Sequence, residues 1–246
     1  MRSHINREFE MMRNIVLTAL SGVLLSSCAF FSPKDEDRTY YYLTGKDITP
    51  ETTSEQVVNV IGRSMTMAGG NYEVQAYPIT RSLLEVQARE LAKSRGLSEE
   101  QVKKVNLTHE QEFLAQKNCF NVSFAVVNFE QASQLEDWKI HFIDAGLDEY
   151  PMLWRDEDLK RRSVRTKLQR QEGNLDRWLG HGIVCTDSPF PLEKGFGLKI
   201  TPKYVQWPFP ASQKLLWEFD YVDTNEQGEE VLVKKVKQDY QPYRGW

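Results

Sequence analysis

The sequence predicts a mainly β protein, an antiparallel β-sandwich with an α-helical section on its N-terminal side. Two patterns lead to this prediction. Short segments in residues 113–246 alternate apolar and polar side chains between turn residues, whereas residues 47–112 hold apolar side chains at helical spacing. The chain has 246 residues, of which 40% are hydrophobic and 27% charged. This is enough for one globular domain of sandwich size or for two small domains.

The N-terminus carries the most apolar stretch of the chain. Arg13 supplies a positive charge before an uncharged run from Ile15 to Leu25. The run is shorter than the roughly 20 residues that span a bilayer, and it has the length of the apolar centre of a secretory signal peptide. The residues before it are mixed in charge, and we expect translation to start at Met11 or Met12.

The tetrad Leu25-Ser26-Ser27-Cys28 follows this run and resembles the lipobox of bacterial lipoproteins. The resemblance implies cleavage before Cys28, diacylglycerol on its sulfur and acylation, for example by palmitate, of its new amino group. Two or three acyl chains anchor a protein firmly, since each buried CH₂ contributes about 0.8 kcal/mol. The alternative is an ordinary signal peptide with a chance cysteine. Ala29 stands where Asp is the familiar inner-membrane signal, and the resemblance therefore implies the outer membrane.

On this reading residues 1–27 are a lipoprotein signal peptide, and residues 28–46 are the lipidated cysteine with a flexible tether. The tether includes the charged segment S-P-K-D-E-D-R, and aromatic residues from Tyr40 onward mark the start of ordered structure. We expect a protein of the cell envelope, attached to the membrane through its lipid and facing either the periplasm or the cell surface.

The chain has three cysteines, and setting Cys28 aside leaves Cys119 and Cys185. An even pair in an exported protein predicts a disulfide. It would close a long loop and contribute on the order of 4 kcal/mol in the chain-entropy model. Two separate buried thiols are the alternative. The sequence contains no C-x-x-C motif and no pair of histidines at metal-binding spacing. We therefore expect no metal site and no cofactor.

The helical section, 47–112, contains three expected helices. The first begins near Pro50 and ends before a break that includes Gly69-Gly70. The second, from Arg81 to Arg95, ends at Gly96. The third opens with the capping-box pattern S-E-E-Q at Ser98. Two helices this close could form a helix-turn-helix, but an exported chain with a net charge of -4 argues against nucleic acid as a partner.

The β section, 113–246, shows several alternating segments. The expected strands lie at 119–129, 138–142, 183–185, 196–200 and 215–221, and residues 231–236 return as the hairpin partner of the last. The order of strand, polar excursion and strand between Val122 and Asp144 loosely resembles uncharacterised exported β-sandwich lipoproteins. That resemblance implies no activity.

No catalytic residue stands out. The cluster His109, Glu110 and Glu112 is better explained as a polar segment before a strand than as a metal site, and no serine-nucleophile motif is present. Carboxylate pairs cannot be judged, because their separation in space decides their chemistry.

Two segments are candidates for binding. A basic run without acidic residues could bind phosphate groups, or it could be a solvated face; its residues are Lys160, Arg161, Arg162, Arg165, Lys167 and Arg170. A proline-stiffened loop could present Trp207 and Phe209 to a partner, or these rings could seal the end of the sandwich.

The sequence therefore predicts a non-enzymatic, lipid-anchored envelope protein with a structural or assembly role and a protein partner in the envelope. A small-ligand or polysaccharide-binding module is the alternative. An envelope hydrolase is the least favoured possibility.

Overall fold

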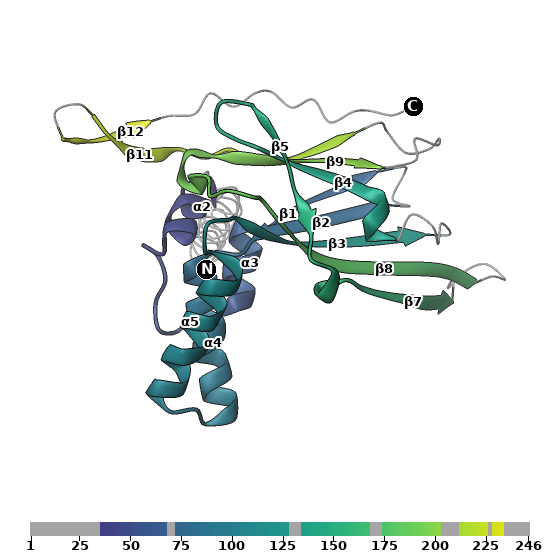
Figure 1. The fold of residues 1–246 in the computed structure, drawn as a ribbon, viewed down its shortest axis with the longest axis horizontal. Helices are drawn as coiled ribbons and strands as arrows, with labels where there is room; N and C mark the ends of the chain where they lie inside the picture. Colours follow the sequence, from purple (N-terminus) through teal and green to yellow (C-terminus); the bar gives the residue numbers. More distant parts are fainter. Residues whose placement is uncertain are drawn as a thin grey trace, which may run out of the picture. The chain divides into compact units, whose positions relative to one another are not determined.

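The computed structural model describes residues 35–67, 72–127, 134–167, 174–202, 212–225 and 228–233. This part of the chain is mostly antiparallel β-sheet with four α-helices (Figure 1). The helices are α2 (Asp35–Thr44), α3 (Ser54–Ile61), α4 (Arg81–Arg95) and α5 (Glu99–Phe113). Among the described residues, no helix is both long and apolar enough to cross a membrane.

Sheet A is the larger of the two main sheets. Its strands run in the order β1-β2-β3-β8-β6, and β7 also pairs with β8, on the same side as β6. All pairs are antiparallel. The strands are β1 (Arg63–Met67), β2 (Tyr72–Pro78), β3 (Cys119–Val127), β6 (Leu153–Trp154), β7 (Lys160–Lys167) and β8 (Asn174–Cys185).

Sheet B has the order β10-β9-β4-β5, and a separate hairpin is formed by β11 and β12. The strands are β4 (Trp138–Ile143), β5 (Glu149–Pro151), β9 (Phe196–Pro202), β10 (Gln213–Trp217), β11 (Tyr221–Thr224) and β12 (Glu230–Val233). Short 3₁₀ turns are η4 (Leu135–Asp137), η5 (Asp156–Asp158) and η6 (Leu192–Lys194).

Sheets A and B share one hydrophobic core, which makes the arrangement sandwich-like. Aromatic rings join the two sheets. Phe120 of β3 lies 5.6 Å from Phe196 of β9 and 6.0 Å from Trp217 of β10, measured between ring centroids. Phe124 of β3 stacks on Trp138 of β4 at 5.1 Å. The alternation predicted for 119–129 and 138–142 is confirmed by the burial of β3 and β4 over their described lengths.

The helix pair α4–α5 confirms the sequence pattern in detail. Gly96 ends α4 in the left-handed conformation, and Ser98 and Gln101 form the expected capping box of α5. The α3 helix begins at Ser54 with Thr53 as its cap, later than the predicted start at Pro50. The indole Nε1 of Trp217 donates to the carbonyl of Ile61 at the end of α3 (2.5 Å), which ties this helix to sheet B.

Three features differ from the prediction. Residues 47–112 are not wholly helical, because the hairpin β1–β2 lies among them and joins sheet A. The predicted tether, 28–46, overlaps α2, where Tyr40 and Tyr42 pack into hydrophobic clusters of the body. Strand β8 extends well before the predicted 183–185. The predicted signal peptide, 1–27, and Cys28 lie outside the described residues.

Candidate functional site

The outer face of sheet A is the face turned away from the shared core. On β3, Phe120, Val122 and Phe124 point into the core, so the alternate residues Asn121 and Ser123 lie on the outer face. The helix pair α4–α5 meets this face at one end (Figure 1). The contact is a small apolar cluster of the disulfide with Ile79, Leu84, Ile183, Phe113 and Leu114.

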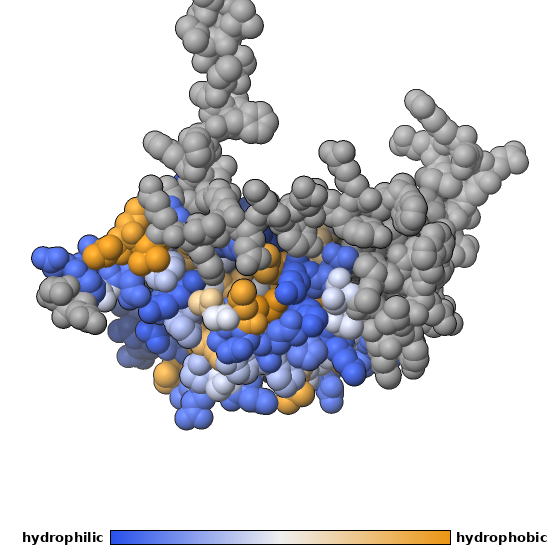
Figure 2. Space-filling model, turned by 90° about the horizontal axis from the view of Figure 1, so that it is seen from above, coloured by the Kyte–Doolittle hydropathy of each residue, from blue (hydrophilic) through white to orange (hydrophobic). Residues whose placement is uncertain are grey.

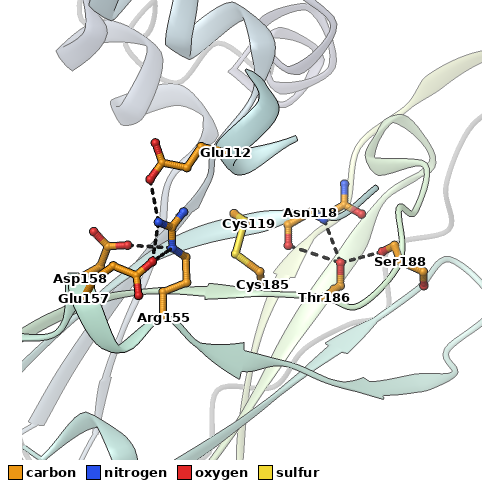
Figure 3. Close-up of a disulfide and its surroundings, with 9 residues drawn as sticks. All are labelled: Glu112, Asn118, Cys119, Arg155, Glu157, Asp158, Cys185, Thr186 and Ser188. Atoms are coloured by element: carbon orange, nitrogen blue, oxygen red, sulfur yellow. Dashed lines mark hydrogen bonds and ion pairs between the residues drawn. A yellow bond between two sulfur atoms is a disulfide. The ribbon is translucent and has the colours of Figure 1, made fainter. Parts of the chain in front are cut away.

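The predicted disulfide between Cys119 and Cys185 is confirmed (Figure 3). The two cysteines stand directly opposite each other on β3 and β8, with their Cα atoms 4.1 Å apart. This is the close, non-hydrogen-bonded type of antiparallel pair, which brings the two Cβ atoms near enough to be joined. Cys119 is fully buried and Cys185 is 7% exposed, because α4 and α5 cover them.

A polar pair continues the strands next to the disulfide (Figure 3). The backbone N–H of Asn118 donates to Thr186 Oγ1 (2.8 Å), and that hydroxyl donates to the carbonyl of Ser188 (2.7 Å). The side chain of Asn118 in turn binds both backbone groups of Phe190. These contacts fix the chain where β8 leaves the sheet.

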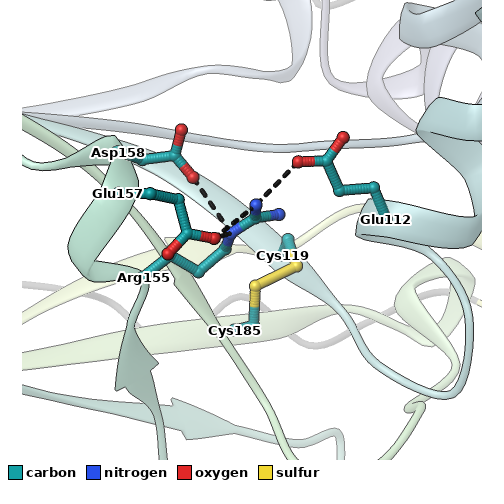
Figure 4. Close-up of polar contacts among 6 residues, drawn as sticks. All are labelled: Glu112, Cys119, Arg155, Glu157, Asp158 and Cys185. Carbon is teal, nitrogen blue, oxygen red and sulfur yellow. Dashed lines mark hydrogen bonds and ion pairs between the residues drawn. A yellow bond between two sulfur atoms is a disulfide. The ribbon is translucent and has the colours of Figure 1, made fainter.

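Arg155 lies on the other side of the disulfide and binds three carboxylates (Figure 4). Its Nη2 is 2.7 Å from both Glu112 Oε1 and Glu157 Oε1, and its Nε is 2.9 Å from Asp158 Oδ2. The guanidinium also lies 4.7 Å from the centroid of the Phe113 ring. Burial disfavours the charged guanidinium and so tends to lower its pKa. The hydrogen bonds to Glu112 and Glu157 outweigh this effect, and the pKa of Arg155 is raised.

Arg155 therefore clamps the end of α5 to the segment after β6. Glu112, Glu157 and Asp158 each form an ion pair with Arg155, whose side chain is only 14% exposed. The cluster is suited to holding the helix pair on the sheet rather than to acid–base chemistry. Glu112, part of the cluster considered from sequence, is one of these partners, and its neighbour Glu110 pairs with Arg81.

Beyond the helix pair, a row of polar residues crosses the outer face of sheet A. Each member stands directly opposite the next on the neighbouring strand. The row, from β2 through β3 and β8 to β7, is Gln75, Ser123, His181 and Lys160. With about 4.8 Å between neighbouring strands, the row spans roughly 14 Å.

This row lines a groove of about 570 Å³, called here the sheet A groove. Glu73, Ala125 and Leu179, one register step away, complete the same wall. At the β2 end, Gln75 Nε2 donates to Glu73 Oε1 (2.8 Å). Farther along, the Ser123 hydroxyl, the His181 ring and the Lys160 ammonium have no polar partner in the described part of the chain. The groove thus holds three adjacent free polar groups.

His181 is half-buried in this groove. Burial, and then the positive charge of Lys160, lower its pKa from the ordinary 6.5, while Asp158 acts weakly in the opposite sense. The ring is therefore neutral at pH 7 and offers one donor and one acceptor nitrogen.

The basic segment of the sequence forms β7, which is a strand at the edge of sheet A within the described residues. Lys160 stands opposite His181 on the outer face. Arg161 stands opposite Gly180, and its guanidinium lies 4.7 Å from the Trp178 ring on the other face. In the register of β7 with β8, Arg162 pairs with Leu179, Arg165 with Asp176 and Lys167 with Asn174. Arg170 lies outside the described residues.

The structure describes only some of the other residues that the sequence suggested as binding sites. Trp207 and Phe209 lie outside the described residues and stay predictions. Within the described ranges, no group of three potential metal ligands comes together. The sequence reasoning missed the sheet A groove and the Arg155 clamp. The alternation of Leu179, His181 and Ile183 was the available signal, but only the strand register reveals which residues meet.

The β11–β12 hairpin presents an exposed apolar surface. Val231 is 44% and Leu232 56% exposed, and Figure 2 shows apolar surface over this hairpin at the left of the view. The hairpin is tied to η6 by the ion pair of Lys194 with Asp223, at 2.9 Å.

The comparisons with known proteins give little guidance. No family model matches the chain, and no curated protein matches it. One solved structure is similar in part, a novel protein of unknown function from Burkholderia pseudomallei K96243. It has a TM-score of 0.30 and 10% identity, and the match covers 63% of this chain and 77% of that one. The chain thus has a weak structural neighbour in a bacterial protein whose function is unknown.

Proposed function

We propose that the chain is a lipoprotein of a bacterial cell envelope, held in the outer membrane by acyl chains on Cys28, and that it acts by binding rather than by catalysis. The observation that carries the proposal is the order of Arg13, the apolar run and the tetrad Leu25-Ser26-Ser27-Cys28. An ordinary signal peptide needs the first two features but not the third.

The Cys119–Cys185 disulfide supports the export part of the proposal. Disulfides form and persist in oxidising compartments and are rare in the reducing cytosol. This pair is buried under the helix pair, where it acts as a structural crosslink. A β-sandwich for the body agrees with the shared core of sheets A and B.

The proposed role is structural or in assembly, with a protein partner in the envelope. Support comes from the exposed apolar residues of β12, since exposed apolar surface is typical of contact sites. The basic residues of β7 and the aromatic pair Trp207 and Phe209 remain candidate contacts. Crosslinking in cells followed by purification of the chain tests this role, and recovery of one specific envelope protein is the expected result.

The anchor is tested by Cys28→Ser in the full chain. We expect this variant to lose labelling by radioactive palmitate and to move from the membrane to the soluble fraction, because no thiol remains to accept diacylglycerol. Ser27→Ala keeps a small residue in the tetrad and should behave as the wild type. Membrane retention of an unlabelled Cys28→Ser protein would contradict the proposal.

A further inference from the structure

The sheet A groove carries an inference that goes beyond the envelope role. We propose that it binds an oxyanion, a phosphate or a carboxylate, attached to a small polar body such as a sugar, with Lys160, His181 and Ser123 as the binding residues. The proposal does not depend on the lipid anchor.

The donors of the groove point to an anionic group. Lys160 and Ser123 flank His181 in the cross-strand row, and directly opposite residues of an antiparallel sheet have Cβ atoms about 5 Å apart. An ammonium, a ring N–H and a hydroxyl therefore face one short stretch of the groove. Donors at this spacing can contact the oxygens of one phosphate or carboxylate, and a charged partner makes such hydrogen bonds about twice as strong.

The lack of internal partners strengthens this assignment. A half-buried imidazole without a hydrogen bond loses solvation on folding, and most buried polar side chains find a partner in the protein or in water. Lys160 forms no ion pair with any described residue. By contrast, the Nη2 and Nε of Arg155 are bound to carboxylates within the fold. The three groups in the groove are available for a ligand, whereas the charge of Arg155 is already paired with three carboxylates.

The remaining wall of the groove indicates the body of the ligand. Ala125 and Leu179 provide an apolar strip beside the polar row, and Gln75, bound to the Glu73 carboxylate, lines the β2 end of the groove. An apolar strip next to neutral donors and acceptors suits a sugar ring, which has C–H faces and hydroxyl edges. A volume of about 570 Å³ falls in the range of small-molecule sites.

The position of β7 at the sheet edge explains its basic composition only in part. Lysine and arginine on an edge strand prevent pairing with other chains. That role accounts for charge anywhere along β7. It does not require that His181 and Ser123, on inner strands beside Lys160, lack partners. The combination of the three is what a ligand would explain.

Calorimetric titration of the purified full chain tests the proposal with four probes: glucose 6-phosphate, glucuronate, inorganic phosphate and glucose. We expect binding of at least one of the two charged sugars, and their ranking distinguishes phosphate from carboxylate. Glucose should bind at least roughly tenfold more weakly, because it lacks the charged acceptor. If the sugar ring contributes to binding, the affinity for inorganic phosphate should lie between the affinity for the charged sugar and that for glucose.

Variants then locate the site. Lys160→Gln and Ser123→Ala should each weaken binding of the charged sugar, the former by about tenfold. Lys103→Gln removes the same charge from the exposed surface of α5 and should leave binding unchanged. The thermal midpoint of each variant shows whether the fold is intact.

Three results would overturn the proposal: no binding of either charged sugar at millimolar concentration, equal binding of glucose, or an equal loss in Lys103→Gln and Lys160→Gln. Failure of the Cys28→Ser experiment bears only on the anchor, and failure of these titrations bears only on the groove.

Discussion

Thr186 shows how much of the local structure depends on one hydroxyl. Its Oγ1 accepts from the backbone of Asn118 and donates to the carbonyl of Ser188, and the side chain is almost fully buried. No water replaces such a partner easily at a buried site. A valine of the same shape would leave the Asn118 N–H without its acceptor.

We therefore expect Thr186→Val to lower the free energy of unfolding by about 1–3 kcal/mol, the usual cost of an unsatisfied buried group. Urea denaturation measures this difference. Thr186→Ser retains the hydroxyl and loses only a methyl group, and so it should be the milder change. If the serine variant is as unstable as the valine variant, packing rather than hydrogen bonding determines the stability at this position.

The groove residues illustrate what single residues cannot reveal from sequence. The disulfide between Cys119 and Cys185 could be predicted because an even number of cysteines remains once Cys28 is set aside, and the structure confirms this disulfide. His181 carried no such signal, because its importance comes from the neighbours that the register of β3, β7 and β8 brings to it. Arg155 carried no signal either, since its partner Glu112 lies 43 residues away in the sequence.

At the scale of elements, prediction succeeded where local chemistry decides the structure. The caps of α4 and α5 involve residues within a few positions of each other, and the turn between β11 and β12 contains its own Asn225 and Gly228. Prediction failed for the hairpin β1–β2. Its first strand, R-S-M-T-M, has little intrinsic β preference and is stabilised by pairing with β2, which in turn pairs with β3.

Only the end of strand β8, residues 183–185, was predicted, for a related reason. Gly180 and Gly182 interrupt its apolar pattern, and glycine is uncommon inside strands. In the structure a Cβ at position 182 would lie 2.8 Å from Leu159 Cδ2 and 3.1 Å from both Leu135 Cδ1 and Trp154 Cζ3. Because Gly182 has no side chain, Leu159, Leu135 and Trp154 can pack into this space. A single sequence cannot indicate this packing requirement.

The α5 helix depends unusually on its ends. None of its residues is fully buried, so little apolar packing supports it. Its N-terminus is held by the reciprocal bonds of Ser98 and Gln101, and its C-terminal part by Arg155 and Arg81. Loss of the cap should therefore affect the first turn of this helix more than the sheets.

Replacing Ser98 with Ala removes the acceptor for the Gln101 N–H, and we expect a loss of about 1 kcal/mol. Amide hydrogen exchange should show faster exchange confined to the first turns of α5. Ser98→Asp supplies another good capping oxygen and should restore slow exchange. Equal exchange rates in the alanine variant and the wild type would mean that tertiary contacts, and not the cap, hold this end.

At the scale of the whole molecule, the disulfide joins the two central strands of sheet A at the point where the helix pair meets it. The crosslink spans 66 residues, and this loop includes β4 of sheet B as well as β6 and β7. In the chain-entropy model, closing a loop of this length destabilises the unfolded chain by about 4 kcal/mol. The reduced protein should keep its sheets, because the shared core of sheets A and B is separate from the cluster around the disulfide.

The double variant Cys119→Ala/Cys185→Ala should accordingly fold with unchanged circular dichroism but unfold at a lower denaturant concentration, with a loss of about 2–4 kcal/mol. Wild-type protein in strong reductant should move to nearly the same midpoint, whereas the double variant should not respond to reductant. Cys28→Ala is the matched control, since it removes a cysteine outside the crosslink and should leave the midpoint unchanged. A reductant effect that persists in the double variant would show that another thiol, and not this disulfide, controls stability. A double variant as stable as the wild type would assign the stability of the body to its core alone.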